Sequence, residues 1–189
     1  LYWVGHCYLS EEGGVDRRDT LKALKYLGKA AEQGHIAAHY HLAIIYRNGV
    51  EDVQADKDAF LRHLSVAVEG GDPDALFCLA DCFMQGLDGY PKDPAMAVPY
   101  LERAVAHEHA DAAVTLGALY YGGLAGLGQD KRKAFELYNT AAELGSLDAW
   151  RNLASMYYIG DGVPKNEDVA RQIMKVVFNK DGIPSDPKP

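Results

Sequence analysis

The stretch from Asp111 to Gly145, DAAVTLGALYYGGLAGLGQDKRKAFELYNTAAELG, carries two helical patterns separated by glycines. Ala112, Leu116 and Tyr120 stand four residues apart, which places them on one face of a helix. Beyond the glycines, alanines and larger apolar residues recur on one face of a second pattern. The stretch therefore predicts a helical hairpin that packs through small side chains.

The same pattern recurs along the chain. A leucine returns every 37 residues, at Leu42, Leu79, Leu116 and Leu153. Each leucine has an alanine four residues before it, an aromatic residue four residues after it and a glycine three residues beyond that. A truncated first copy includes Val4 and Tyr8. One helical pair cannot bury its apolar face alone, so this repetition predicts stacked pairs in a solenoid.

Helix-start and helix-stop signals divide the chain into five pairs. We predict first helices over 1–10, 37–48, 73–85, 110–121 and 147–159, and second helices over 20–33, 56–69, 94–107, 131–144 and 166–179. The predicted N-caps of the second helices are Asp19, Asp56, Asp93, Asp130 and Asn166. We predict that Gly34, Gly70 and Gly145 end second helices. In the second helix of the second pair, we predict that the row of apolar residues facing the core begins at Ala59.

These signals predict one repeat array over residues 1–180. Its units run over about 1–35, 36–71, 72–109, 110–146 and 147–181. Residues 182–189 contain three prolines, which predicts an extended tail.

The amino-acid composition limits the classes of molecule that the protein is expected to bind. Apolar residues make up 48% of the 189, which is ordinary for a folded chain. Lys and Arg number 19 against 27 Asp and Glu, which gives a net charge of −8. Nucleic acids and anionic membranes require a basic surface, so this balance argues against both as general partners.

The three cysteines, Cys7, Cys78 and Cys82, do not form a disulfide framework, because their number is small and odd. We expect Cys78 and Cys82, four apart on a helix, to be buried apolar residues, with a redox pair or half of a metal site as the alternative. This usage favours a compartment where thiols stay reduced, such as the cytoplasm or an organelle matrix, although the sequence leaves the compartment undetermined.

No apolar run reaches the roughly 18 residues of a membrane span, so we expect no direct membrane insertion. No signal peptide is visible. Leu1 lies inside a helical pattern, which leads us to expect a longer N-terminal region before it.

The repeated residues resemble the Sel1-like repeat, a relative of the tetratricopeptide repeat. The resemblance rests on the spacing A-x3-L-x3-Y-x2-G, then a loop, then D-x-x-K-A-x6-A-A-E-x-G, which the stretch from Ala112 to Gly145 matches almost throughout. It covers the chain from Val4 to about Phe178. It implies an all-α, right-handed superhelix of about five repeats, and it implies an adaptor or scaffold rather than an enzyme. The repeated cysteines of some members are missing here.

The resemblance to tetratricopeptide arrays also implies a concave face. That face is lined by first-helix positions two before, two after and five after the repeat leucine. The rule selects Tyr2, His6 and Leu9; Tyr40, Ile44 and Arg47; Phe77, Asp81 and Met84; Val114, Ala118 and Tyr121; and Arg151, Ser155 and Tyr158. Aromatic side chains and arginine anchor many interfaces, so we predict a protein-binding groove. The alternative is that some of these residues belong to a second layer of the core.

Other candidate sites are weaker. His35 and His39, with His41 and His63 near them, have a spacing that can chelate zinc, but no carboxylate motif accompanies them, so surface or interface histidines are the default. The glycines from 122 to 128 lack the preceding strand and the Gly-Lys-Ser/Thr ending of a phosphate loop. No serine or cysteine stands in a nucleophile motif. We expect no catalytic residue, cofactor or metal.

The sequence thus favours a non-enzymatic scaffold or adaptor that binds a protein or peptide on the concave face of the repeat array. The alternative is a structural or assembly-factor subunit of a large complex, membrane-bound or organellar, whose neighbours would bury the helix edges. An enzyme is the weakest hypothesis.

Overall fold

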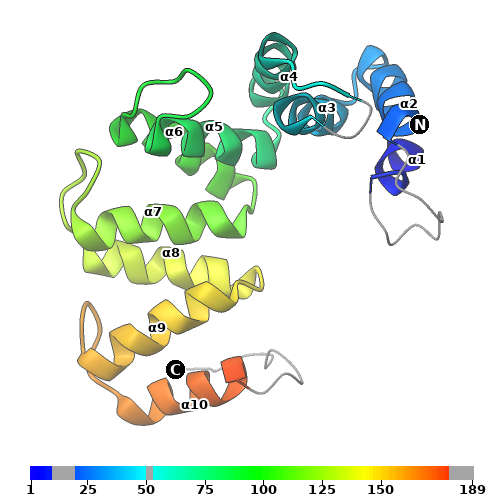
Figure 1. The fold of residues 1–189 in the computed structure, drawn as a ribbon. Coiled ribbons are helices and arrows are strands. Elements are labelled where there is room, and N and C mark those ends of the chain that lie inside the picture. Colours follow the sequence, from blue (N-terminus) through cyan, green and yellow to red (C-terminus); the bar gives the residue numbers. More distant parts are fainter. Residues whose placement is uncertain (10–19, 50–52, 179–189) are drawn as a thin grey trace. The chain divides into compact units, whose positions relative to one another are not determined.

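The computed structural model describes residues 1–9, 20–49 and 53–178. These residues form ten α-helices and no β-strand (Figure 1). The helices are α1 Tyr2–Cys7, α2 Thr20–Glu32, α3 Ile36–Asn48, α4 Lys57–Glu69, α5 Pro73–Gln85, α6 Pro94–Ala106, α7 Ala110–Gly122, α8 Lys131–Glu143, α9 Leu147–Ile159 and α10 Glu167–Phe178. None of the helices in this described part of the chain is both long and apolar enough to cross a membrane.

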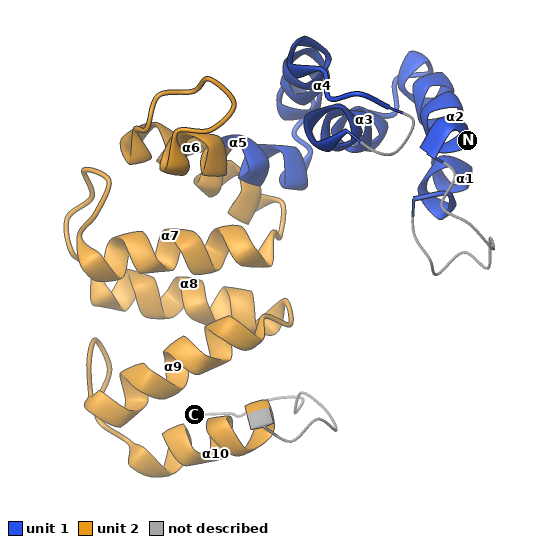
Figure 2. Ribbon diagram, viewed as in Figure 1, with its two compact units in different colours: residues 1–79 blue, residues 80–189 orange. Residues whose placement is uncertain are grey.

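Two compact units make up the chain, residues 1–79 and residues 80–189 (Figure 2). In the first unit α1 packs against α2 and α3 against α4, with α2 also in contact with α3. In the second unit α7 packs against α8 and α9 against α10, with α6 on α7 and α8 on α9. Within each unit, these helices therefore contact a hairpin partner or a neighbour in the next repeat, as in a stack of helical pairs.

The predicted N-caps that lie in the described residues are confirmed. The side chains of Asp56, Asp93, Asp130 and Asn166 accept hydrogen bonds from backbone N–H groups of Ala59, Ala95, Lys133 and Val169. These bonds satisfy donors that have no partner inside the helix. The predicted cap at Asp19 and the predicted tail over 182–189 lie outside the described residues.

The small residues of the repeat form the core. The alanines four before the repeat leucines have no exposed surface, and Leu42, Leu79, Leu116 and Leu153 are all buried. A ring-on-ring contact joins the two helices of three pairs: Tyr8 on Tyr26, Tyr46 on His63 and Phe83 on Tyr100. The alanines allow close approach of the helices, and the stacked rings fill the wider space at or just after the end of the first helix in these three pairs.

In the second pair, the glycine with positive φ lies one residue after the predicted one. Gly70 has φ −72° and ends α4 in the right-handed region, whereas Gly71 has φ +78°. Gly70 is instead required for space, because an added Cβ would lie 2.6 Å from Cγ2 of Ile36. The inner face of α4 begins with Ala59, which is 3% exposed, and continues with Phe60 and Leu64, each 1% exposed.

The first helix is also shorter than predicted, because α1 ends at Cys7 and Tyr8 lies in a turn.

Candidate protein-binding surfaces

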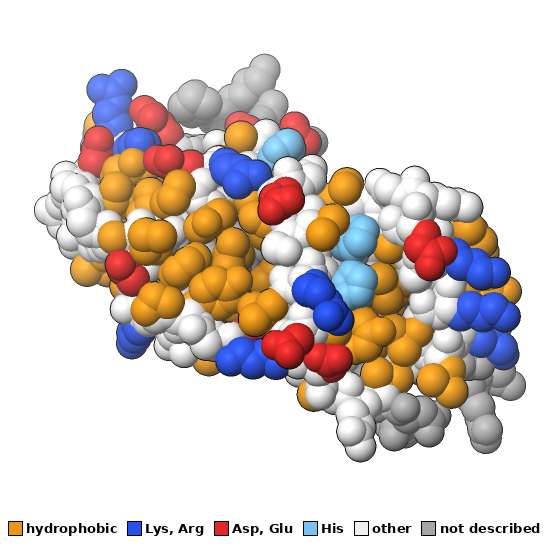
Figure 3. Space-filling model, turned by 90° about the horizontal axis from the view of Figure 1, so that it is seen from above, with side chains coloured by type: hydrophobic (Ala, Val, Ile, Leu, Met, Phe, Trp, Pro, Cys, Tyr) orange, Lys and Arg blue, Asp and Glu red, His pale blue; other side chains and the backbone are white. Residues whose placement is uncertain are grey.

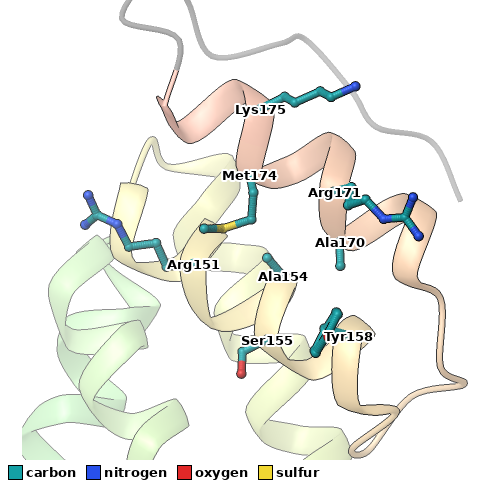
Figure 4. A pocket seen from close by; sticks show the side chains of 8 residues that line it. All are labelled: Arg151, Ala154, Ser155, Tyr158, Ala170, Arg171, Met174 and Lys175. Carbon is teal, nitrogen blue, oxygen red and sulfur yellow. The ribbon is translucent and has the colours of Figure 1, made fainter.

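A pocket of about 750 Å³ lies between α9 and α10 in the second unit (Figure 4). Its lining residues are Arg151, Ala154, Ser155 and Tyr158 of α9, and Ala170, Arg171, Met174 and Lys175 of α10. Ala154, Ala170 and Met174 face the space between the helices, whereas the long side chains of Arg171 and Lys175 extend away from it. The pocket therefore has an apolar floor and a rim that carries cations.

Local sequence fixes both walls of this pocket. Ser146 begins α9, where its hydroxyl oxygen accepts from the Ala149 N–H at 3.2 Å, and Gly160 ends it in the left-handed conformation. Asn166 begins α10 by accepting from the Val169 N–H at 3.1 Å. Glu167 lies in the first turn of α10, where a carboxylate interacts favourably with the helix dipole.

Two positions in the pocket differ from the preceding repeat. In that repeat, an added Cβ at Gly117 of α7 would lie 2.8 Å from Cε1 of Tyr138, so the tyrosine ring fills the space between α7 and α8. Ala154 stands 37 residues after Gly117, and Met174 has the same spacing from its N-cap as Tyr138. A thinner, unbranched methionine thus replaces a planar ring at the corresponding place in α10.

The charges at the rim all have the same sign. Arg151 forms an exposed ion pair with Asp148, and Arg171 lies 3.5 Å from carboxylate oxygens of both Glu167 and Asp168. Exposed pairs of this kind contribute little to stability, about 0–1 kcal/mol, so the guanidinium groups can exchange these partners for carboxylates of a bound molecule.

Tyr158 is the aromatic residue of the pocket. Its side chain is 57% exposed, and Lys165 Nζ lies 5.8 Å from the ring centroid. Lys165 in turn pairs with Glu167 at 2.8 Å, and this carboxylate raises the pKa of the lysine. A large, accessible ring beside cations is a typical interface anchor.

The other predicted residues of the second unit differ in their surroundings. Val114 and Tyr121 are half-buried and pack against the core cluster around Leu153. The Tyr121 hydroxyl donates to the Asp161 carboxylate at 2.6 Å, which raises the pKa of the tyrosine. Ala118 is exposed, and Asp81 and Met84 are half-buried.

In the first unit the structure brings Tyr2 and His6 together with two histidines outside the predicted face. Tyr2 stacks on His35 with ring centroids 4.1 Å apart, and its hydroxyl lies 3.0 Å from His41 Nε2. The ring centroids of His6 and His41 are 5.1 Å apart. Burial, His6 and His35 lower the pKa of His41, and Asp74 opposes them.

Four further predicted residues in this unit, Tyr40, Ile44, Arg47 and Phe77, are half-buried, as is Leu9. Burial is the main cause that raises the pKa of Tyr40. The Arg47 guanidinium lies 5.5 Å from the Phe60 ring centroid and contacts Cys78 Sγ at 3.7 Å, so this arginine supports the fold of the first unit.

None of the fifteen predicted surface residues is fully buried. On the side that Figure 3 displays, hydrophobic side chains are exposed among basic, acidic and histidine side chains. Sequence reasoning missed the α10 side of the pocket, because the rule selected first helices alone. The signal was present in Ala170, Arg171, Met174 and Lys175, which alternate apolar and basic side chains at a helical spacing.

The described residues contain no group of three or more His, Cys, Asp or Glu side chains arranged to hold a metal ion.

Comparison with known proteins agrees with the helical repeat structure. The family model of the Sel1 repeat matches residues 1–35, 36–72, 73–109, 110–146 and 148–175. No curated protein matches the chain. The all-α repeat fold expected from the sequence is confirmed by these matches and by the ten helices of the described residues.

Solved structures resemble the chain over most of its length. A Sel1 repeat protein from Oxalobacter formigenes has 26% identity and a TM-score of 0.82, over 93% of this chain and 70% of that one. The c5321 protective antigen of uropathogenic Escherichia coli has 27% identity and a TM-score of 0.76, over 93% of this chain and 37% of that one. The immunity protein Pa5087 from Pseudomonas aeruginosa, at 19% identity and a TM-score of 0.64 over 92% of this chain and 65% of that one, shares the fold alone.

Proposed function

Because the chain belongs to the Sel1 repeat family, we propose that it is a non-enzymatic scaffold that binds a protein partner through side chains on its first helices. Sel1 repeat proteins generally act in protein–protein interaction, and the family is typically non-catalytic. The observation that most directly supports this proposal is the pocket between α9 and α10. Three of its lining residues, Arg151, Ser155 and Tyr158, belong to the surface predicted from the sequence.

The chemistry of the pocket defines the partner. Its apolar floor of Ala154, Ala170 and Met174 accepts one or two apolar side chains, which gain free energy when they leave water. The basic side chains of Arg171 and Lys175 favour carboxylates beside those apolar residues. The partner is therefore a peptide or helix in which apolar side chains are flanked by Asp or Glu.

Two steps test the proposal. Crosslinking mass spectrometry on native material identifies the partner and the face that it contacts. The affinity of the purified partner is then measured for the wild type, for Tyr158→Ala and for Arg171→Glu. We expect each substitution to weaken binding by about tenfold or more, because central aromatic and arginine anchors carry much of an interface's energy.

Arg132→Glu is the matched control for charge reversal. Arg132 lies on α8, its side chain is 87% exposed, and it is absent from the pocket lining. Its reversal should leave the affinity unchanged within about twofold. Equal affinity for the wild type and both pocket variants, all folded by circular dichroism, would exclude the pocket as the binding site. Crosslinks spread over helix edges, with the native protein eluting only in a large assembly, would favour the structural-subunit alternative.

A further inference from the structure

The second helical pair, α3 and α4, carries two histidines where other repeats carry residues that do not titrate near neutral pH. His39 stands three residues before the repeat leucine. The same position in the next three repeats is held by Leu76, Ala113 and Trp150, at intervals of 37 residues. His63 stands 37 residues after Tyr26 and 37 residues before Tyr100. In this repeat, two packing positions are therefore held by imidazole rings, which can take up protons.

The His63 ring occupies a structural place. It stacks on Tyr46 with centroids 5.7 Å apart and an interplanar angle of 5°. The corresponding stacks in the neighbouring repeats are nearly identical, at 5.9 Å and 8° for Tyr8 on Tyr26, and at 5.9 Å and 7° for Phe83 on Tyr100. The imidazole thus does the packing that a tyrosine ring does elsewhere, and it adds a titratable nitrogen.

That nitrogen contacts the other histidine. The Nδ1 atoms of His39 and His63 lie 3.0 Å apart, and both side chains are half-buried. A hydrogen bond at this distance needs a proton on one nitrogen and a lone pair on the other. When both rings are protonated, both nitrogens are donors, so the hydrogen bond is lost. Two positive charges then lie close together in a half-buried environment, where they repel each other.

The surroundings of His63 favour its neutral form. Burial, His39 of α3 and Arg62 of α4 all lower its pKa from the ordinary value of 6.5. None of these groups is a carboxylate that could stabilise a positive charge. As the pH falls, His63 therefore takes up a proton in the unfolded chain before it does so in the folded protein. The stability that the neutral His63 ring contributes is fully present above about pH 6.5 and is lost as the pH drops toward the pKa of His63 in the folded protein.

We propose that the His39–His63 contact is an acid-sensitive joint, which holds α4 on α3 at neutral pH and releases it when both rings are protonated. The same helix α3 carries Tyr40 and Ile44 of the predicted partner surface, so acid would also disturb that surface. This last consequence rests on the proposed function, whereas the joint itself does not.

Hydrogen exchange with mass spectrometry on the full chain tests the joint without a partner. Exchange is compared at about pH 7.5 and about pH 5.5, after correction for the intrinsic pH dependence of amide exchange. We expect protection of 36–48 and 57–69 to fall about tenfold in acid. The helices over 131–143 and 147–159 serve as an internal control and should keep their protection.

His63→Tyr is the decisive variant, because it restores the ring of Tyr26 and Tyr100 without the titratable nitrogen. We expect it to lose most of the acid response in α3 and α4. His39→Leu, which introduces the residue found at Leu76, should do the same and replaces the first variant if that one folds poorly. His107→Gln removes an exposed histidine of the second unit and should respond to acid as the wild type does.

His41 remains in both variants, so the effect of its protonation is common to all proteins compared. The difference between the wild type and His63→Tyr therefore reports the joint alone. An equal loss of protection in the wild type and in both folded variants would overturn the inference, as would an equal loss in the two units.

Discussion

The Tyr121 hydroxyl of α7 donates a 2.6 Å hydrogen bond to the Asp161 carboxylate, which lies in the loop after α9. Lys131, at the start of α8, donates to the other oxygen of the same carboxylate at 2.7 Å. One acidic side chain thus joins the fourth repeat to the loop of the fifth. Tyr121, which the sequence predicts on the partner surface, also has this structural contact.

Removal of the Asp161 charge should lower stability in a pH-dependent way. The hydrogen bonds from Lys131 and Tyr121 lower the pKa of Asp161 below its ordinary value of 3.8. Its contribution is therefore present above about pH 3.8 and is lost as the pH falls through the folded-state value. Asp161→Asn should lower the thermal midpoint by a few degrees or less near pH 7, and the difference from the wild type should shrink as the pH falls below about 3.8.

Asp148→Asn provides the control for the loss of one negative charge, because Asp148 pairs only within its own helix with exposed Arg151 in the described structure. Thermal unfolding followed by circular dichroism at both pH values decides the matter. A constant difference between Asp161→Asn and the wild type across pH would contradict the ionised network.

Glu108 adopts a left-handed conformation that its position demands. Its φ is +61°, and the glycines at the corresponding place in the other repeats, Gly34, Gly71 and Gly145, have φ of +82°, +78° and +94°. A residue with a side chain costs about 1–2 kcal/mol in this region, and replacement by glycine removes that cost. Glycine also makes the unfolded chain more flexible, which offsets about 0.4–1 kcal/mol of the gain. Glu108→Gly should therefore raise the free energy of unfolding by about 0.5–1 kcal/mol in urea denaturation.

Glu102→Gly makes the matching change on the exposed face of α6. Glycine in a helix interior costs about 1 kcal/mol, so this variant should be destabilised by that amount. Opposite signs for the two substitutions would identify the left-handed conformation as the cause. A destabilised Glu108→Gly would show that the glutamate side chain supplies a compensating contact.

The cysteines should differ in reactivity according to burial. Cys82 has no exposed surface, Cys78 is 8% exposed and Cys7 is half-buried, and none of the three is part of a disulfide. A pulse of alkylating reagent followed by peptide mass spectrometry should label Cys7 first and Cys82 only as fast as the protein unfolds. All three should react together in denaturant. Equal rates for Cys7 and Cys82 in the native protein would show that α5 packs loosely.

The helical register was predictable because it depends on local signals that recur. The 37-residue spacing places alanine, leucine and an aromatic ring on one face, and Asp56, Asp93 and Asp130 mark helix starts by their own hydrogen bonds. The roles of Gly70 and Gly71 were not separable, since either can take positive φ. Only the contact with Ile36 across the turn decides which glycine serves for space.

The sites depend on contacts between helices, which spacing alone does not give. In the pocket, Ala154 and Met174 take the places that Gly117 and Tyr138 hold in the preceding repeat, and this comparison needs both helices in place. The 37-residue spacing places His63 at the position of Tyr26 and Tyr100, but its contact with His39 joins residues 24 apart on two helices. The sequence therefore predicted which residues differ between repeats better than what each difference does.

The contact between Gly117 and Tyr138 provides the last test. An alanine at 117 would place its Cβ 2.8 Å from the ring of a tyrosine that is 4% exposed. Overpacking of a core costs about 1–3 kcal/mol, and the better helix propensity of alanine returns about 1 kcal/mol. Gly117→Ala should thus lower the free energy of unfolding by about 1 kcal/mol.

Gly28→Ala is the control, because no atom lies within 4 Å of its added Cβ in α2, and this variant should be stabilised by up to about 1 kcal/mol. A double-mutant cycle with Tyr138→Leu, measured by urea unfolding, should show that Gly117→Ala costs less once the ring is gone. An unchanged cost in that background would mean that the strain does not come from contact with the tyrosine ring.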